Sequence, residues 1–137
     1  MRRGFTSAIL VFALAAASGC RKESAACECD GDKQKDDLCV ISENQLPDSV
    51  ETDAGIWSSA PWENADWLGF PADAELQIAH SLGRAPVSVL VYLSFDSRNE
   101  SAFLAAGDLA RVTSVTKKSV TIKNNTKQCF YLRIVLE

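Results

Sequence analysis

Apolar and polar residues alternate with a period close to two along most of the chain after residue 74. Leu76 and Ile78 are separated by a polar residue, and a longer apolar row follows at Val87, Val89, Val91, Leu93 and Phe95. This period places alternate side chains on opposite faces, so both segments are expected to be strands. Leu90 and Tyr92 are also apolar, which predicts that the second strand is buried on both sides at its centre, as in a sandwich.

The C-terminal part, 110–136, reads as three more strands separated by polar turns at 116–119 and 124–127. Val120 and Ile122 mark the inward face of the middle strand. In the last strand Phe130, Leu132, Ile134 and Leu136 are expected to point inward, with Tyr131 and Arg133 on the other face. Between the long strand and these three, a loop or a single helical turn is expected around Phe103 to Ala106. The pattern predicts an all-β protein, a small antiparallel β-sandwich over residues 54–137.

Three tryptophans precede these strands. Trp57, Trp62 and Trp67 are spaced by five, which fits neither a strand face nor a helical stripe, and Pro61 and Pro71 interrupt the segment. An irregular segment is therefore expected. The tryptophans either form a platform that binds a sugar ring or a partner side chain, or they cover an open end of the sandwich.

The N-terminus has a different apolar pattern. Arg2 and Arg3 precede an apolar run at 8–17, and small residues lead into Cys20. This is the layout of a cleaved secretory signal, and about ten apolar residues are too few to span a membrane comfortably, since a spanning helix needs roughly 20. A short transmembrane or buried core helix is the alternative.

Ala17-Ser18-Gly19-Cys20 resembles the lipobox of bacterial lipoproteins. The resemblance implies removal of residues 1–19, attachment of fatty acyl chains such as palmitate to Cys20, and Cys20 as the mature N-terminus. The family favours leucine where this chain has Ala17. Arg21 follows in place of the aspartate often found in lipoproteins of the inner membrane, so the resemblance implies a cell-envelope protein anchored by lipid in the outer membrane. Membrane lipid is then a partner through acylated Cys20.

Composition divides the remainder of the chain. Without residues 1–19, 118 of the 137 residues remain, enough for one small domain. The formal net charge of −4 becomes about −6 when the two arginines of the signal are removed, and no basic face suited to nucleic acid is apparent. Residues 20–53 are highly charged and contain no aromatic residue, which predicts a flexible acidic tether.

Four cysteines follow Cys20: Cys27, Cys29, Cys39 and Cys129. In an oxidising compartment an even number of thiols is usually paired, and four allow three connectivities. A Cys27–Cys29 bond is disfavoured because a one-residue spacer strains the disulfide. Free or buried thiols are one alternative, and zinc ligation is another, but the paired Cys-x-x-Cys pattern of zinc sites is missing. The acidic run at 30–37 also departs from the calcium-loop pattern. No metal and no cofactor is expected.

The piece 76–92 resembles the tip domains of phage tail fibres and H-type lectin sandwiches. His80-Ser81-Leu82-Gly83 ends one strand, and Pro86-Val87-Ser88-Val89 begins the next. The resemblance implies a small sandwich that recognises glycans or protein surfaces, and it carries over no ligand residue.

An enzyme is not expected, because His80 is the only histidine and no Gly-x-Ser-x-Gly elbow presents a serine. His80 is expected to cap a turn. The sequence favours a membrane-anchored lipoprotein with a binding module for glycan or protein, with Trp57, Trp62 and Trp67 as ligand-binding candidates. A structural or assembly component of an envelope complex is the alternative.

Overall fold

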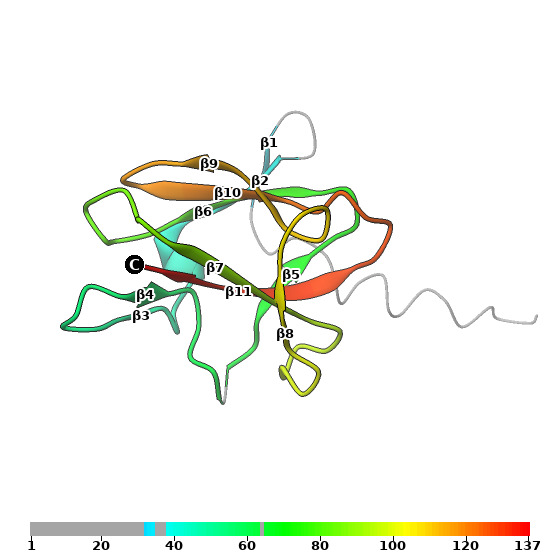
Figure 1. Cartoon of the computed structure of the whole chain (residues 1–137), viewed down its shortest axis with the longest axis horizontal. Coiled ribbons are helices and arrows are strands. Elements are labelled where there is room, and N and C mark those ends of the chain that lie inside the picture. The colour runs from blue at the N-terminus through cyan, green and yellow to red at the C-terminus, as the bar shows by residue number, and fades with distance from the viewer. Residues whose placement is uncertain (1–31, 35–37, 64) are drawn as a thin grey trace, which may run out of the picture.

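The fold is a two-layered β-sandwich. A computed structural model describes residues 32–34, 38–63 and 65–137. The first sheet has the order β1-β2-β6-β10-β9 and contains β1 (Asp32–Gln34), β2 (Leu38–Ile41), β6 (Glu75–Ala79), β10 (Ser119–Lys123) and β9 (Arg111–Val115). Figure 1 shows this sheet as the upper layer. The predicted all-β sandwich is confirmed.

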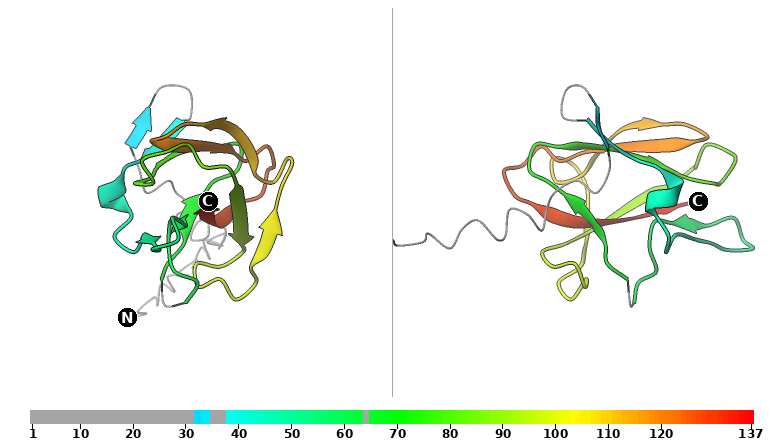
Figure 2. Two further views of the ribbon diagram at one scale, coloured as in Figure 1. Left: turned by 60° about the vertical axis from the view of Figure 1, so that its left-hand side comes forward. Right: turned by 180° about the vertical axis from the view of Figure 1, so that it is seen from behind.

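The second sheet is built around the last strand, β11 (Phe130–Leu136). Its order is β3-β4-β11-β7-β8, and β5 also pairs with β11. The other strands are β3 (Val50–Glu51), β4 (Trp57–Ser58), β5 (Leu68–Phe70), β7 (Val89–Ser94) and β8 (Phe103–Ala105). Figure 2, from behind, shows the β9–β10 hairpin above β11. A short 3₁₀ helix, η1 (Glu43–Gln45), follows β2.

The core lies between the two sheets and is made by the alternating apolar rows. Leu76 and Ile78 from β6 and Val120 and Ile122 from β10 are fully buried, as are Leu132, Ile134 and Leu136 from β11. β10 pairs antiparallel with β6, and β11 with β7, in unbroken register. The predicted inward faces of β6, β10 and β11 are confirmed, because only one face of each can be covered by the opposite sheet.

Two expectations about the middle of the chain are wrong. Val91 and Leu93 are buried, but Val87 and Phe95 lie outside β7 and are exposed, and Tyr92 is half-buried on the outer face. The long strand is therefore covered fully on one side only. Phe103 to Ala105 form the edge strand β8 rather than the expected loop or single helical turn, because Val91 to Leu93 of β7 offer them a hydrogen-bonding edge.

The folded domain begins earlier than residue 54. β2 pairs with β6 in the one parallel pairing among the described strands, and Cys39, Ile41 and Leu46 are buried in the core. Residues 38–53, expected from the sequence to belong to the tether, are therefore part of the sandwich. The reason is the short apolar run Leu38 to Ile41, which fills a place beside β6 that no other described strand occupies.

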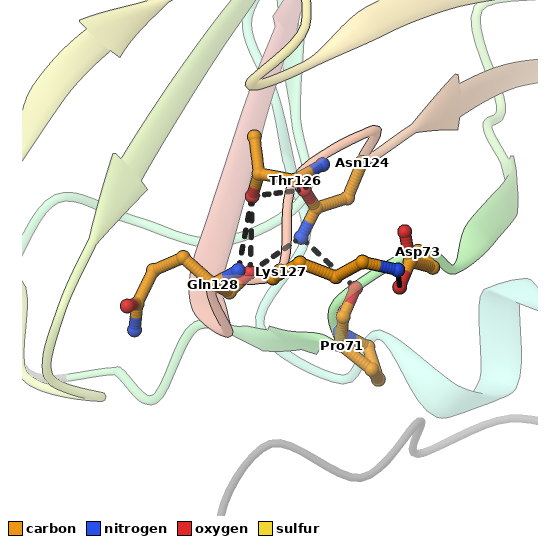
Figure 3. A network of polar contacts seen from close by, with 6 residues as sticks. All are labelled: Pro71, Asp73, Asn124, Thr126, Lys127 and Gln128. Carbon is orange, nitrogen blue, oxygen red and sulfur yellow. Dashed lines mark hydrogen bonds and ion pairs between the residues drawn. The ribbon is translucent and has the colours of Figure 1, made fainter.

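A buried amide fixes the start of β11. The Nδ2 group of Asn124 donates to the carbonyl oxygens of Pro71 (2.9 Å) and Gln128 (2.8 Å), and its Oδ1 accepts from the backbone N–H (2.9 Å) and Oγ1 (2.7 Å) of Thr126. Figure 3 shows this network, with the exposed Lys127–Asp73 ion pair beside it. The amide thus joins the β10–β11 turn to the connection between β5 and β6.

The expected signal 1–19, with Cys20, lies outside the described residues. Within the described ranges, no helix has the length and apolar character needed to cross a bilayer.

Candidate functional site

The outer face of the second sheet carries an aromatic and cationic surface. Tyr92 in β7 and Arg133 in β11 are directly opposite each other in the antiparallel register. Their strand neighbours Val91, Leu93, Leu132 and Ile134 are buried in the core. Because successive side chains in a strand point to opposite faces, Tyr92 and Arg133 lie together on the face away from the core.

The connection between β4 and β5 passes over this pair. Ser59 forms reciprocal bonds with Ile134: its backbone N–H donates to the Ile134 carbonyl (3.1 Å), and its Oγ accepts from the Ile134 N–H (3.1 Å). One residue on, the Ala60 carbonyl accepts from Nε of Arg133 at 2.8 Å. These bonds fix the chain just before Trp62 and direct it across β11.

A second loop holds the other side of this connection. Nδ2 of Asn99 donates to the Trp62 carbonyl, and the Trp67 N–H donates to the Ser97 carbonyl at 3.2 Å. The loop is ordered by Asp96, whose carboxylate accepts from Ser101 Oγ at 2.8 Å. That bond is the main reason the pKa of Asp96 lies below its ordinary value; desolvation opposes it, and bonds from two backbone N–H groups and Ser94 add to the lowering.

Four side chains then meet, and we call Trp62, Trp67, Tyr92 and Arg133 the Trp62 cluster. The Trp62 ring is edge-on to Tyr92, with centroids 5.1 Å apart, and edge-on to Trp67 at 5.6 Å. The Arg133 guanidinium lies over the rings of Trp62 and Tyr92, 5.3 Å from the Trp62 centroid and 5.7 Å from the Tyr92 centroid. Such edge-on and cation–π contacts hold the ring of Trp62 in one orientation.

The three tryptophans have different environments. Trp62 is 44% exposed, whereas Trp57 and Trp67 are each only 2% exposed. An exposed platform of all three is therefore wrong: Trp57 belongs to the hydrophobic core, and Trp67 is buried next to Trp62. Trp67 supports Trp62 from beneath, and its indole N–H has no hydrogen-bond partner in the part of the chain that the structure describes.

Sequence reasoning missed Tyr92 and Arg133 as members of a site. Alternation placed Arg133 on an outer face, but Tyr92 was expected to be buried. The available signal was the pairing of the two strands, since a long β7 next to the last strand would bring both residues to one face.

His80 is a structural residue. It is 3% exposed, its ring lies 6.1 Å from that of Trp57, and its Nε2 is 3.2 Å from the Thr116 carbonyl in the β9–β10 turn. Burial lowers its pKa, against smaller opposite effects of the bond to Thr116 and the charge of Glu43. His80 thus ties β6 to a neighbouring hairpin turn.

The cysteines divide between described and undescribed parts of the chain. Cys39 is buried in β2, Cys129 is half-buried just before β11, and neither lacks a partner. Cys27 and Cys29 lie outside the described residues. Among the residues described, no group of three His, Cys, Asp or Glu side chains is placed to hold a metal ion. The side chains of the acidic run 30–37 fall outside that search.

Comparison with known proteins gives no relative. The chain matches no protein-family model, no curated protein and no solved structure at a significant level.

Proposed function

We propose that the chain is a membrane-anchored bacterial lipoprotein whose β-sandwich is a recognition module for a glycan or a protein, and that the Trp62 cluster is its binding surface. The observation that carries the proposal is Trp62 itself. Trp62 is 44% exposed, yet its ring is held by Tyr92, Trp67 and Arg133. A rigid exposed aromatic residue binds with little loss of conformational entropy.

Binding is tested by a screen of glycans with the purified full-length chain and the Trp62→Ala variant. Phe95→Ala is the matched control, since Phe95 is also an exposed ring but contacts Phe103 and Phe130 rather than the Trp62 cluster. Loss of binding in Trp62→Ala alone, with an unchanged melting temperature, supports the proposal. Equal binding by both variants and the parent chain contradicts it.

The proposed membrane anchor is Cys20. The lipobox-like Ala17-Ser18-Gly19-Cys20 supports acylation, removal of residues 1–19 and a position in the cell envelope, at the outer membrane. Intact mass of the protein isolated from membranes is the test. A mass for residues 20–137 plus acyl chains is expected, and Cys20→Ser should release the protein from the membrane fraction. An unmodified chain that begins at Met1 contradicts the anchor.

The same measurement tests the disulfides. Cys39 and Cys129 are both engaged, and an exported chain supports pairing of all four cysteines that follow Cys20. Reduction of the intact protein should therefore add about four hydrogen masses, one for each sulfur released. No change in mass on reduction contradicts the pairing. We propose no catalytic role, because His80 is buried and bonded to a backbone carbonyl.

A permanent place in an envelope complex is the second candidate. It is favoured by Leu104 in β8, which is exposed directly opposite Tyr92 and extends the surface across a third strand. Trp, Tyr and Arg are also the residue types that dominate protein interfaces. Purification from membranes distinguishes the two candidates: a stable partner with no free pool of the chain favours the complex.

A further inference from the structure

Arg133 is a half-buried cation that has no counter-ion among the residues the structure describes. Its side chain lies between Trp62 and Tyr92, and the described ranges contain no carboxylate within ion-pair distance of it. Of its five N–H donors, the Nε–H is the one with an acceptor in the described part of the chain, the Ala60 carbonyl. Desolvation lowers the pKa of Arg133, and the electrostatic interaction with Tyr92 acts against this effect.

A partly desolvated charge is stabilised by an opposite charge brought to it. The planar guanidinium matches a carboxylate with two parallel hydrogen bonds, and these charge-assisted bonds are about twice as strong as neutral ones. Fixing the guanidinium in advance lowers the entropic cost of forming them. Arg133 is fixed by the Ala60 bond and by two ring contacts, so its remaining donors are organised for an anion.

We propose that the Trp62 cluster binds a saccharide that carries a carboxylate, with the carboxylate on Arg133 and the sugar ring on Trp62. This inference rests on the proposed function and names its ligand class. One exposed indole next to one guanidinium that has no ion-pair partner in the described part of the chain matches a single acidic sugar, whereas a stable protein interface needs roughly 800 Å² on each partner. The chain as a whole is negative, so the attraction is local to Arg133 and acts at contact.

The probes are a galacturonate trisaccharide and sialyllactose, each compared with its methyl ester, which keeps the sugar and removes the charge. The full-length chain should bind at least one of the two acids about tenfold more tightly than its ester, as expected for a hydrogen bond to a charged group. Arg133→Met keeps the aliphatic stem and should reduce the difference to less than about twofold. Arg133→Lys keeps the charge without the planar fork and should give an intermediate preference.

Arg111→Met is the matched control, because Arg111 is an exposed arginine on β9 of the other sheet, and it should leave the preference unchanged. Equal affinity for acid and ester in the parent chain overturns the carboxylate inference. If neutral glycans still bind and Trp62→Ala abolishes that binding, the proposed function stands without it. If no saccharide binds, neutral or acidic, both the inference and the glycan part of the proposed function fail.

Discussion

Replacing Asn124 by alanine should be among the most destabilising substitutions in the domain. The amide is completely buried and makes four hydrogen bonds of 2.7 to 2.9 Å to Pro71, Gln128 and Thr126. Each such bond contributes about 1 kcal/mol net, and a buried group left unpaired costs about 1–3 kcal/mol. Because the Thr126 side is partly open to water, we expect a total loss of about 3–4 kcal/mol.

The assay is urea unfolding of the parent chain and the variant, with the free energy of unfolding as the readout. For a domain of about 100 residues, this loss lowers the melting temperature by on the order of 15 °C. Lys127→Ala is the internal control. Its ion pair with Asp73 lies beside the Asn124 network but is largely exposed, so its removal should cost less than about 1 kcal/mol. A loss below about 1 kcal/mol in Asn124→Ala, or an equal loss in both variants, refutes the reasoning.

Three further predictions follow from the core and the site. Ile41→Ala should lower the free energy of unfolding, measured with urea, by about 2–5 kcal/mol because Ile41 is in the core. Val40→Ala should lower it by clearly less, and equal small effects of the two variants would show that β2 is not part of the folded domain. Burial lowers the pKa of His80, so the unfolded chain takes up a proton before the folded chain does as the pH falls. The contribution of His80 to the free energy of unfolding is therefore fully present above pH 6.5 and declines as the pH falls through and below that value. His80→Phe should flatten this part of the pH–stability profile, and an unchanged profile would show that another group causes the decline. Asp96→Ala should loosen the loop that holds the Trp62 carbonyl, so calorimetry should show weaker ligand binding with little change in the melting temperature. An unchanged affinity would show that the loop does not position Trp62.

The strands that could be predicted were those with a strong contrast between their two faces. In β6, β10 and β11, fully buried and partly exposed positions alternate over at least five residues, and each inward row is apolar. Alternation is a local property that depends only on having one covered face. Such strands can therefore be predicted without knowledge of the partner strand.

The missed elements depend on long-range pairing. Phe103 to Ala105 include leucine and alanine, which favour helix, and become a strand through the edge of β7. Leu38 to Ile41 are four apolar residues in a highly charged segment, and their burial depends on β6, far along the chain. Local composition cannot report a partner that is distant in sequence.

The site follows the same rule. The sequence identified Trp62 as a candidate but could not separate it from Trp57 and Trp67, because exposure depends on the path of an irregular connection. Arg133 and Tyr92 become neighbours only through the register of β7 and β11. Their contact with Trp62 further requires the bonds from Ser59 and Asn99.

The central claim is that recognition takes place at Trp62. The most direct measurement is the nuclear magnetic resonance spectrum of the three indole N–H groups during titration with a ligand found in the glycan screen. The Trp62 resonance should shift to saturation, while that of Trp57, buried beside His80, should stay in place. A saturable ligand that leaves the Trp62 resonance unmoved would contradict the account.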